Sequence, residues 1–335
     1  MRGTYWRIMT RTGKPCYHGP TAADRKNVVR WKIYKLESAM FNDCKLICSD
    51  VDGTLLDSEH KLPARNVEAI RRVVAKGIPF VLASGRIAGS LEHLQREAGF
   101  RGPLICLNGA YIIDGQTLIF ERTLPPDVAR TLVPFARSEG MQVFLYKGTR
   151  WFVDEIDEWV AYERRVSTVE GECRSFEELL ASWERSGEGF HKLLFMSENP
   201  HTVEHCMRLL TDRFSDMLTI YQSSPRYIEI LAKDMDKGVG VEKLAEYLGI
   251  GLNQVLAIGD FYNDIPMLKA AGRGIAMGNA PEPVREVADY STDTNDEAGL
   301  ASALEREILG TEGDLDARRW PQRPYNDPHT RGGNR

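Results

Sequence analysis

The sequence predicts an α/β protein built on a doubly wound parallel sheet, with a second, α+β domain inserted into it. Short apolar runs without polar alternation are separated by amphipathic helical segments, before residue 123 and again after residue 226. Strands of this kind are typical of parallel sheets that helices cover on both faces. Residues 123–226 show strand-like alternation instead, which indicates a separate unit.

The first part of the sheet comes from three apolar runs. They are residues 45–51, 78–84 and 103–109. A helix is expected from about Pro63, with apolar side chains on one face and Gly77 as its stop, and a second helix near 88–98. Strands and helices therefore alternate here.

The same alternation returns near the C-terminal end. Val241, Leu244, Ala245 and Leu248 have the i, i+3, i+4, i+7 spacing of a helix, and Gly249 suits the position after it. Further elements follow in order: a strand at 254–260, a helix through Ile265 and Leu268, and a strand at 274–278.

The intervening segment supplies the expected insert. Its strand-like segments and one helix are residues 141–147, 150–155, 191–197, 226–232 and 201–214. We expect a core domain at 43–122 and 227–310, an inserted domain at 123–226, an N-terminal extension at 1–42 and a disordered tail at 311–335. Met40 could be a start codon, so the extension is interpreted as disordered or upstream sequence.

Composition favours a cytoplasmic protein with an ample core. Of 335 residues, 42% are hydrophobic and 27% charged, and no apolar run reaches the roughly 18 residues that span a bilayer. The six cysteines form no CxxC pair, which is typical of reduced thiols. Residues 1–39 hold nine Lys and Arg but two acidic residues, so the rest of the chain is acidic. We therefore expect neither nucleic acid nor membrane as a partner; the basic segment could still be a transit-like segment or an arm.

Polar side chains gather where the expected strands end. Asp50 and Asp52 follow the first strand, and Ser84, Gly85 and Arg86 follow the second. Asp260, Asn263 and Asp264 follow the strand at 254–260, and Lys237 begins the helix before it. Parallel strands bring such residues to one edge, where several carboxylates are tolerated only with a cation. Mg²⁺ suits oxygen ligands, and without a Cys/His cluster zinc is not expected.

These motifs in this order, DxDGT, SGR, Lys and GDxxND, resemble the haloacid dehalogenase superfamily. The segments "LNGAYIID" and "GIAMGNAPEPVREVADYST" resemble its Cof-like phosphatase branch, whose insert is a class IIB cap domain. The match runs from about Asp43 to Leu309. The resemblance implies a Rossmann-like core with a cap.

The resemblance also implies a role for each motif residue. Asp50 is the nucleophile that forms an aspartyl-phosphate, and Asp52 is the acid/base, whose pKa we expect anionic neighbours to raise. Asp50, the Asp52 carbonyl and Asp260 hold Mg²⁺, with Asp264 a direct or outer ligand. The implied phosphate- or substrate-binding residues are Thr54, Ser84, Gly85, Arg86, Lys237 and Asn263. For Arg86, a phosphate or cap contact and a structural ion pair are equal alternatives.

The expected function is Mg²⁺-dependent hydrolysis of a small phosphorylated metabolite, such as a sugar phosphate, nucleotide or cofactor phosphate, by a monomer or homodimer. A phosphomutase or phosphotransferase, or a non-catalytic phosphate-sensing protein, is the alternative. Two other patterns receive plain interpretations. "HTVEH" (201–205) matches a zinc-protease motif but is interpreted as a surface helix, and Asn108–Gly109 could be a substrate-facing turn but is interpreted as a simple turn.

Overall fold

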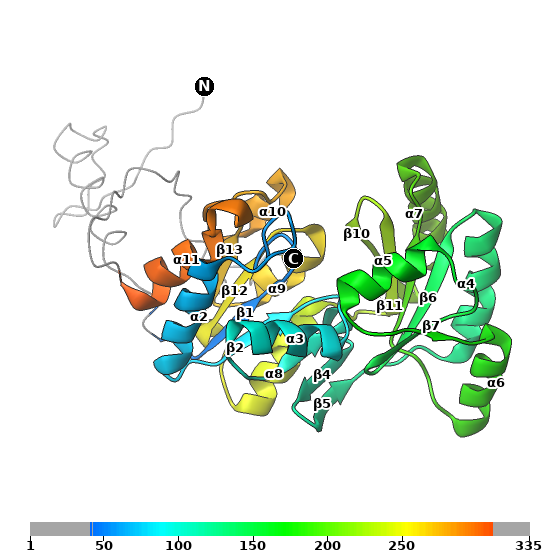
Figure 1. Ribbon diagram of the computed structural model, residues 1–335, viewed down its shortest axis with the longest axis horizontal. Helices are drawn as coiled ribbons and strands as arrows, with labels where there is room; N and C mark the ends of the chain where they lie inside the picture. The colour runs from blue at the N-terminus through cyan, green and yellow to red at the C-terminus, as the bar shows by residue number, and fades with distance from the viewer. Residues whose placement is uncertain (1–40, 42, 311–335) are drawn as a thin grey trace, which may run out of the picture.

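The computed structural model describes residue 41 and residues 43–310, and it shows two domains, each built around its own β-sheet (Figure 1). The expected N-terminal extension at 1–42, apart from residue 41, and the expected tail at 311–335 lie outside these residues. No helix in the described part of the chain is long and apolar enough to cross a membrane.

The first domain, the core domain, contains an eight-stranded sheet in the order β14-β13-β12-β1-β2-β3-β4-β5. The pairs from β14 to β3 are parallel, whereas β4 and β5 form an antiparallel hairpin at one edge. The strands are β1 (Leu46–Ser49), β2 (Phe80–Ala83), β3 (Leu104–Cys106), β4 (Tyr111–Asp114), β5 (Thr117–Glu121), β12 (Val255–Gly259), β13 (Arg273–Ala276) and β14 (Tyr290–Ser291). The predicted α/β class is confirmed.

Helices cover both faces of this sheet, which explains its apolar strands. In β1, Ile47 packs in the cluster that holds one set of helices, whereas Leu46 and Cys48 pack in the cluster that holds the other. The first set is α2 (Ala64–Ala75), α3 (Ala88–Ala98) and α11 (Gly299–Leu304). The second set is α8 (Lys237–Leu248), α9 (Ile265–Ala270) and α10 (Glu282–Val287). Helices exclude water from both faces of the sheet. A strand that alternated polar and apolar residues would therefore bury its polar side chains.

The second domain, the cap domain, contains a six-stranded sheet in the order β10-β11-β9-β6-β7-β8. All of its pairs are antiparallel except β7 with β8. The strands are β6 (Gln142–Lys147), β7 (Arg150–Val153), β8 (Glu172–Cys173), β9 (Lys192–Met196), β10 (Leu218–Ser224) and β11 (Tyr227–Ala232). The helices are α4 (Pro126–Ser138), α5 (Glu158–Ser167), α6 (Phe176–Ser186) and α7 (Pro200–Phe214).

One predicted boundary is wrong. The predicted boundary at 226 places residues 227–232 in the core domain, although the strand-like segment 226–232 is expected in the insert. These residues form β11, which pairs with β9 and β10 in the cap sheet. A boundary at 226 would cut through the β10–β11 hairpin. The chain therefore returns to the core domain after Ala232. Strand β11 is apolar and buried over most of its length, so its composition suits either sheet, and only the pairing decides.

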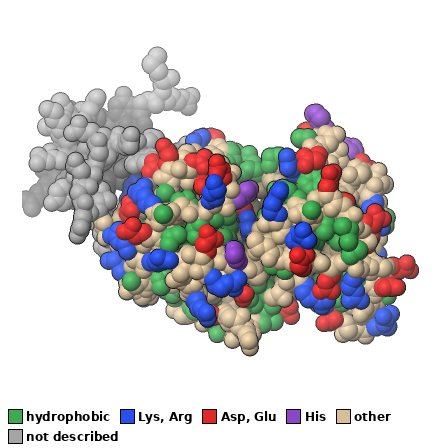
Figure 2. Space-filling view, in the orientation of Figure 1, with side chains coloured by type: hydrophobic (Ala, Val, Ile, Leu, Met, Phe, Trp, Pro, Cys, Tyr) green, Lys and Arg blue, Asp and Glu red, His purple; other side chains and the backbone are tan. Residues whose placement is uncertain are grey.

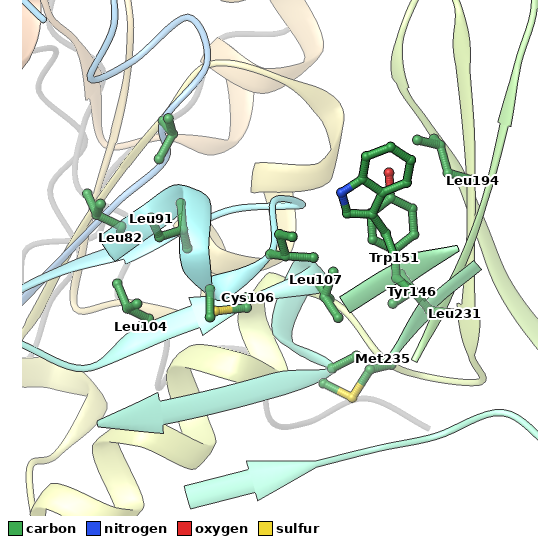
Figure 3. Close-up of a cluster of buried hydrophobic side chains, with 14 of the residues drawn as sticks. Leu82, Leu91, Leu104, Cys106, Leu107, Tyr146, Trp151, Leu194, Leu231 and Met235 are labelled. Carbon is green, nitrogen blue, oxygen red and sulfur yellow. The ribbon is translucent and has the colours of Figure 1, made fainter. Parts of the chain in front are cut away.

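The two domains share a packed junction. One buried apolar cluster runs from Leu82 and Leu104 in the core domain through Leu107 and Met235 to Trp151 in the cap domain (Figure 3). Nearby, the backbones of Leu124 and Phe190 exchange two hydrogen bonds of 2.6 and 3.0 Å. The cap domain therefore contacts the core domain through buried apolar side chains, in addition to the backbone that connects them.

A single buried amide ties the start of the core domain to its end. The Asn66 side chain donates to the Leu55 carbonyl at 2.9 Å and accepts from the Ala301 N–H at 3.0 Å. It therefore fixes α2 against the loop after β1 and against α11.

We expect Asn66→Ala to lower the free energy of unfolding by about 1–3 kcal/mol, because it leaves buried backbone groups without partners. Urea unfolding followed by circular dichroism measures this. Glu68→Ala, an exposed change on the same helix, is the control and should stay within about 0.5 kcal/mol of the parent. Equal midpoints for the two variants would contradict the bridging role.

Candidate active site

The edge formed by the carboxyl ends of β1, β2 and β12 brings the predicted residues together. Asp50 follows β1, Ser84 follows β2 and Asp260 follows β12. The strands are neighbours in the order β12-β1-β2, and the Asp50 N–H donates to the Ile258 carbonyl at 2.9 Å. The topology therefore places Asp50 and Asp260, which are 210 residues apart in the sequence, at one edge of the sheet.

Three carboxylates form the centre of this edge. Oxygen atoms of Asp50, Asp260 and Asp264 lie within 4.8 Å of one another, and all three residues are buried. Lys237, at the start of α8, is also buried, and its Nζ donates to Asp50 Oδ1 and Asp264 Oδ1 at 2.6 Å each. One ammonium group thus faces three carboxylates.

This imbalance changes the acidity of the carboxyl groups. Burial and the Asp264 carboxylate raise the pKa of Asp50 to about 7, although Lys237 opposes them. Burial, Asp50 and Asp264 raise the pKa of Asp260 well above its ordinary value. An oxygen-only donor set with excess negative charge fits a hard divalent cation such as Mg²⁺. The residues present therefore fit the expected metal.

The remaining hydrogen bonds show how the carboxylates differ. Asp264 Oδ2 accepts from the backbone N–H groups of Asp260 and Phe261, both at 2.9 Å, so Lys237 and these amides occupy both of its oxygens. Asp260 Oδ1 accepts from Thr54 Oγ1 at 2.9 Å, and its Oδ2 accepts from Asn279 Nδ2 at 3.3 Å. Thr54 is thus fully buried next to Asp260. It is not among the residues that line the cavity described below, and its predicted role in binding substrate stays a prediction.

Gly53 makes room for this arrangement. Its φ is +81°, in the left-handed region that favours glycine, and a Cβ atom built on it would lie 2.3 Å from Asp260 Oδ2. The turn after β1 therefore needs glycine for two reasons. It must reverse the chain, and it must let Asp260 approach the backbone.

The side chain of Asp52 is paired with Arg86 and is not in contact with the other carboxylates. Arg86 Nη2 donates to Asp52 Oδ1 at 2.6 Å and its Nε to Oδ2 at 2.8 Å, and His60 Nδ1 lies 3.4 Å from Oδ1. Burial raises the pKa of Asp52, but Arg86 and His60 outweigh it and hold the pKa well below its ordinary value. The predicted upward shift is wrong, because a bidentate guanidinium is nearer than the carboxylates.

Arg86 has a second partner in the cap domain. Its Nη1 donates to the Val166 carbonyl in α5 at 2.7 Å and to Ser90 Oγ at 3.1 Å. Two of the roles that the sequence left open for this residue, an ion pair and a cap contact, are therefore present in the structure, and a phosphate contact stays a prediction.

A cavity of about 330 Å³ lies between the two domains and is lined by Asp50 and Asp52. Core residues on its wall include Asp50, Asp52, Ser84, Gly85, Arg86 and Asn263, and cap residues include Tyr146, Glu163, Lys192 and Glu229. A hollow of about 670 Å³ on α2 is larger but contains none of the motif residues. On the visible face, acidic and basic side chains are interspersed over both domains, and no continuous basic groove crosses them (Figure 2).

Several residues at this site are absent from the sequence-based prediction. Asn108, assigned to a simple turn, is fully buried with φ 54° and donates to Glu229 Oε2 at 2.7 Å. Asn279 donates to the Gly53 carbonyl at 2.9 Å. Both follow strands that end at the same edge, so the rule that found Asp260 could have found them. Lys192 and Glu229, on cap strands, carry no comparable signal.

The segment "HTVEH" lies on a surface helix, as the sequence predicted. His201 and His205 are exposed on α7, and His205 lies 3.7 Å from Glu139. Within the described residues, the set of Asp50, Asp260 and Asp264 is the single group of three potential metal ligands.

Comparison with known proteins identifies the family of this chain and the type of reaction. The family model of haloacid dehalogenase-like hydrolases matches residues 47–304. The chain belongs to this family. It is 33% identical over 267 residues to 5-amino-6-(5-phospho-D-ribitylamino)uracil phosphatase of Bacillus subtilis (strain 168), covering 80% of this chain and 97% of that protein.

Solved structures of the family share both domains. A haloacid dehalogenase-like hydrolase from Bacteroides thetaiotaomicron has a TM-score of 0.69 and 33% identity, covering 78% of this chain and 99% of that one. A subclass IIB sugar phosphatase has a TM-score of 0.66 and 27% identity, covering 78% and 98%. The chain is therefore a Cof-like phosphatase of the haloacid dehalogenase family, as the motifs predicted.

We expect Gly53→Ala to lower phosphatase activity by about 100-fold or more, because the new methyl group must displace Asp260 from the cluster. The rate of p-nitrophenyl phosphate hydrolysis measures this. Gly77→Ala is a matched control: Gly77 has the same φ of +81°, but no atom lies within 4 Å of its Cβ position. It should cost stability and leave the rate unchanged, so equal rates in the two variants would contradict the argument.

The raised pKa of Asp50 predicts that the metal-free protein loses stability as pH rises. Its folded pKa of about 7 lies above the unfolded value of about 3.9, so between them the folded state binds the extra proton and stability falls with pH. With chelator at pH 8, Asp50→Asn should therefore raise the thermal midpoint above that of the parent, and the difference should shrink at pH 5. Mg²⁺ should stabilise the parent more than the variant. A lower midpoint for Asp50→Asn at pH 8 would contradict this.

Proposed function

We propose that this protein is an Mg²⁺-dependent phosphatase that hydrolyses a small phosphomonoester through a phosphorylated Asp50. The observation that carries the proposal is the position of Asp50. Its carboxylate lies at the wall of the cavity, in contact with Lys237 and next to two further carboxylates. A carboxylate so placed can reach a phosphorus atom in the cavity.

Lys237 directs which oxygen of Asp50 reacts. It occupies Oδ1, and no hydrogen bond from another described residue reaches Oδ2. Oδ2 is therefore available to attack phosphorus. The ammonium charge also stabilises the carboxylate that leaves when the aspartyl-phosphate is hydrolysed.

Asp52 is positioned to move the proton. In the first half-reaction the Asp50 oxygen bonds to phosphorus, the bond to the leaving oxygen breaks, and Asp52 gives its proton to that oxygen. In the second half, water attacks the phosphorus of the aspartyl-phosphate while Asp52 takes a proton from the water, which releases phosphate and restores Asp50.

Asp52 can hold a proton only if its ion pair with Arg86 weakens. Arg86 Nη2 and Nε take both Asp52 oxygens and keep the carboxyl ionised. An incoming phosphate is a competing anion for the same guanidinium. We infer that binding of substrate draws Arg86 toward the phosphate and so lets the pKa of Asp52 rise.

The metal would be held by Asp50, the Asp52 carbonyl and Asp260, with Asp264 orienting its neighbours because both of its oxygens already have partners. Bound there, Mg²⁺ supplies positive charge against the phosphate oxygens. Ser84, Gly85 and Asn263, on the cavity wall, are the proposed phosphate contacts.

The cavity suits a small polar metabolite. Its volume of about 330 Å³ is near the lower end for ligand sites, and its wall carries hydroxyl, amide and charged groups. Two of the relatives named above are phosphatases of a phosphorylated ribityl compound and of sugars. Among the alternatives, a non-catalytic phosphate sensor is disfavoured, because the cluster of Asp50, Asp260 and Lys237 is complete.

We expect Asp50→Asn to abolish turnover of p-nitrophenyl phosphate, by more than about 10³-fold, because the amide cannot attack phosphorus. Chelation of divalent ions should have the same effect, and Mg²⁺ should reverse it. Asp216→Asn, an exposed change in the cap domain, should leave the rate unchanged. Substantial activity in either the Asp50 variant or the chelated enzyme would show that the mechanism is wrong.

A further inference from the structure

Two buried charged residues of the cap domain reach into the core domain. Lys192, in β9, and Glu229, in β11, are 3% and 4% exposed, and Lys192 Nζ lies 2.8 Å from Glu229 Oε2. The same Nζ donates to the backbone carbonyl of Gly85, in the loop after β2, at 2.7 Å. Lys192 thus joins a cap strand to a motif loop of the core domain.

Glu229 continues the contact on the other side. Its Oε2 accepts from Asn108 Nδ2 at 2.7 Å, and Asn108 Oδ1 accepts from Asn263 Nδ2 at 3.2 Å. The Asn108 backbone N–H also donates to the Ser84 carbonyl at 2.9 Å. A single hydrogen-bonded chain therefore runs from the loop at Ser84–Gly85, through the cap pair, to Asn263.

The loop fits closely against this pair. A Cβ atom on Gly85 would lie 2.9 Å from Asn108 Nδ2 and 3.1 Å from Glu229 Oε1. Gly85 thus has almost no room to move toward the pair, and Lys192 limits movement of its carbonyl. The cap pair therefore packs directly against this loop and is hydrogen-bonded to it.

Stability is a weak explanation for such a pair. Two buried ions lose hydration that their mutual attraction repays only in part, and apolar replacements are often as stable. Lys192 and Glu229 could also be satisfied within the cap, where the Tyr146 ring lies 4.5 Å from Lys192 Nζ. Instead, their remaining hydrogen bonds go to Gly85 and Asn108.

We propose that Lys192 and Glu229 are positioning residues that hold the Ser84–Gly85 loop and Asn263 in the geometry needed for phosphoryl transfer. The proposal rests on the function proposed above. It means that the seated cap completes the phosphate site itself, in addition to enclosing the leaving group. Phosphates too small to contact the cap should therefore still depend on this pair.

The competing explanation is that the pair recognises the leaving group, since both residues line the cavity. The two explanations differ in their dependence on substrate. A recognition role predicts a loss that vanishes when the leaving group is small. A positioning role predicts the same loss for every leaving group.

The test compares Lys192→Met, Glu229→Gln and the double variant with the parent enzyme, using acetyl phosphate, p-nitrophenyl phosphate and a hexose 6-phosphate with Mg²⁺. We expect kcat to fall by about 10- to 100-fold in each variant, by a similar factor for all substrates that the parent hydrolyses. Loss confined to the hexose phosphate, or activity within about twofold of the parent, would overturn the proposal.

Stability measurements exclude a merely structural effect. Each single variant removes one partner of the buried ion pair and should lower the thermal midpoint, whereas the double variant removes both charges and should recover part of the loss. Recovery is partial because the Glu163 carboxyl, whose pKa burial raises and Lys192 lowers, loses this cation as well. Activity should stay low in the double variant. Recovery of activity together with stability would overturn the proposal. The control is Arg130→Gln with Glu184→Gln, an ion pair between two cap helices at 2.7 Å, which should leave kcat unchanged.

The outcome is separable from that of the proposed function. If the parent enzyme hydrolyses none of the phosphates, or if Asp50→Asn retains activity, the proposed function fails. If the parent is active and depends on Asp50 while the Lys192 and Glu229 variants match it, only the positioning role fails.

Discussion

The structure depends on a charge imbalance, in which one buried ammonium group faces three buried carboxylates. Lys237 binds Asp50 and Asp264, and Asp260 lies beside them without a cation of its own. Two backbone amides at Asp264 and the Thr54 hydroxyl at Asp260 reduce the imbalance but do not remove it. The folded chain therefore maintains a site that a divalent cation and a phosphate can complete together.

Maintaining such a site requires a rigid support. Strand β1 is apolar on both faces and packed between helices. The backbone at Asp50 is therefore fixed close to the neighbouring carboxylates. Gly53 and the amides at Asp264 bring Asp260 against the backbone, where a side chain at position 53 would collide with it. The repulsion among the carboxylates at this edge is unfavourable. The burial of apolar side chains in the sheet and its helices offsets that cost, as commonly happens at functional sites.

The sequence predicted what local pattern and strand order determine. Apolar runs located β1, β2 and β12, and the rule that parallel strands share a carboxyl edge brought Asp50 and Asp260 together. The predicted domain boundary at 226 was wrong, because it depends on which strands pair. Strand β11 is as apolar as a strand of the core domain, yet it belongs to the cap sheet. The low pKa of Asp52 depends on Arg86, 34 residues away, and the pair of Lys192 and Glu229 on two cap strands. No spacing in the sequence encodes these contacts.

One short segment connects the chemistry to the position of the cap. Gly85 binds the cap through its carbonyl, which accepts from Lys192, and the next residue, Arg86, binds it through a side chain that donates to the Val166 carbonyl. The same guanidinium holds Asp52, and the same loop carries Ser84. A cap that moved away would therefore break the contacts of Gly85, in the loop proposed to bind phosphate, and of Arg86, the partner of the proposed acid/base Asp52. Because adjacent residues carry both contacts, the proposed phosphate contacts and the proposed acid/base are tied to the cap through one short segment.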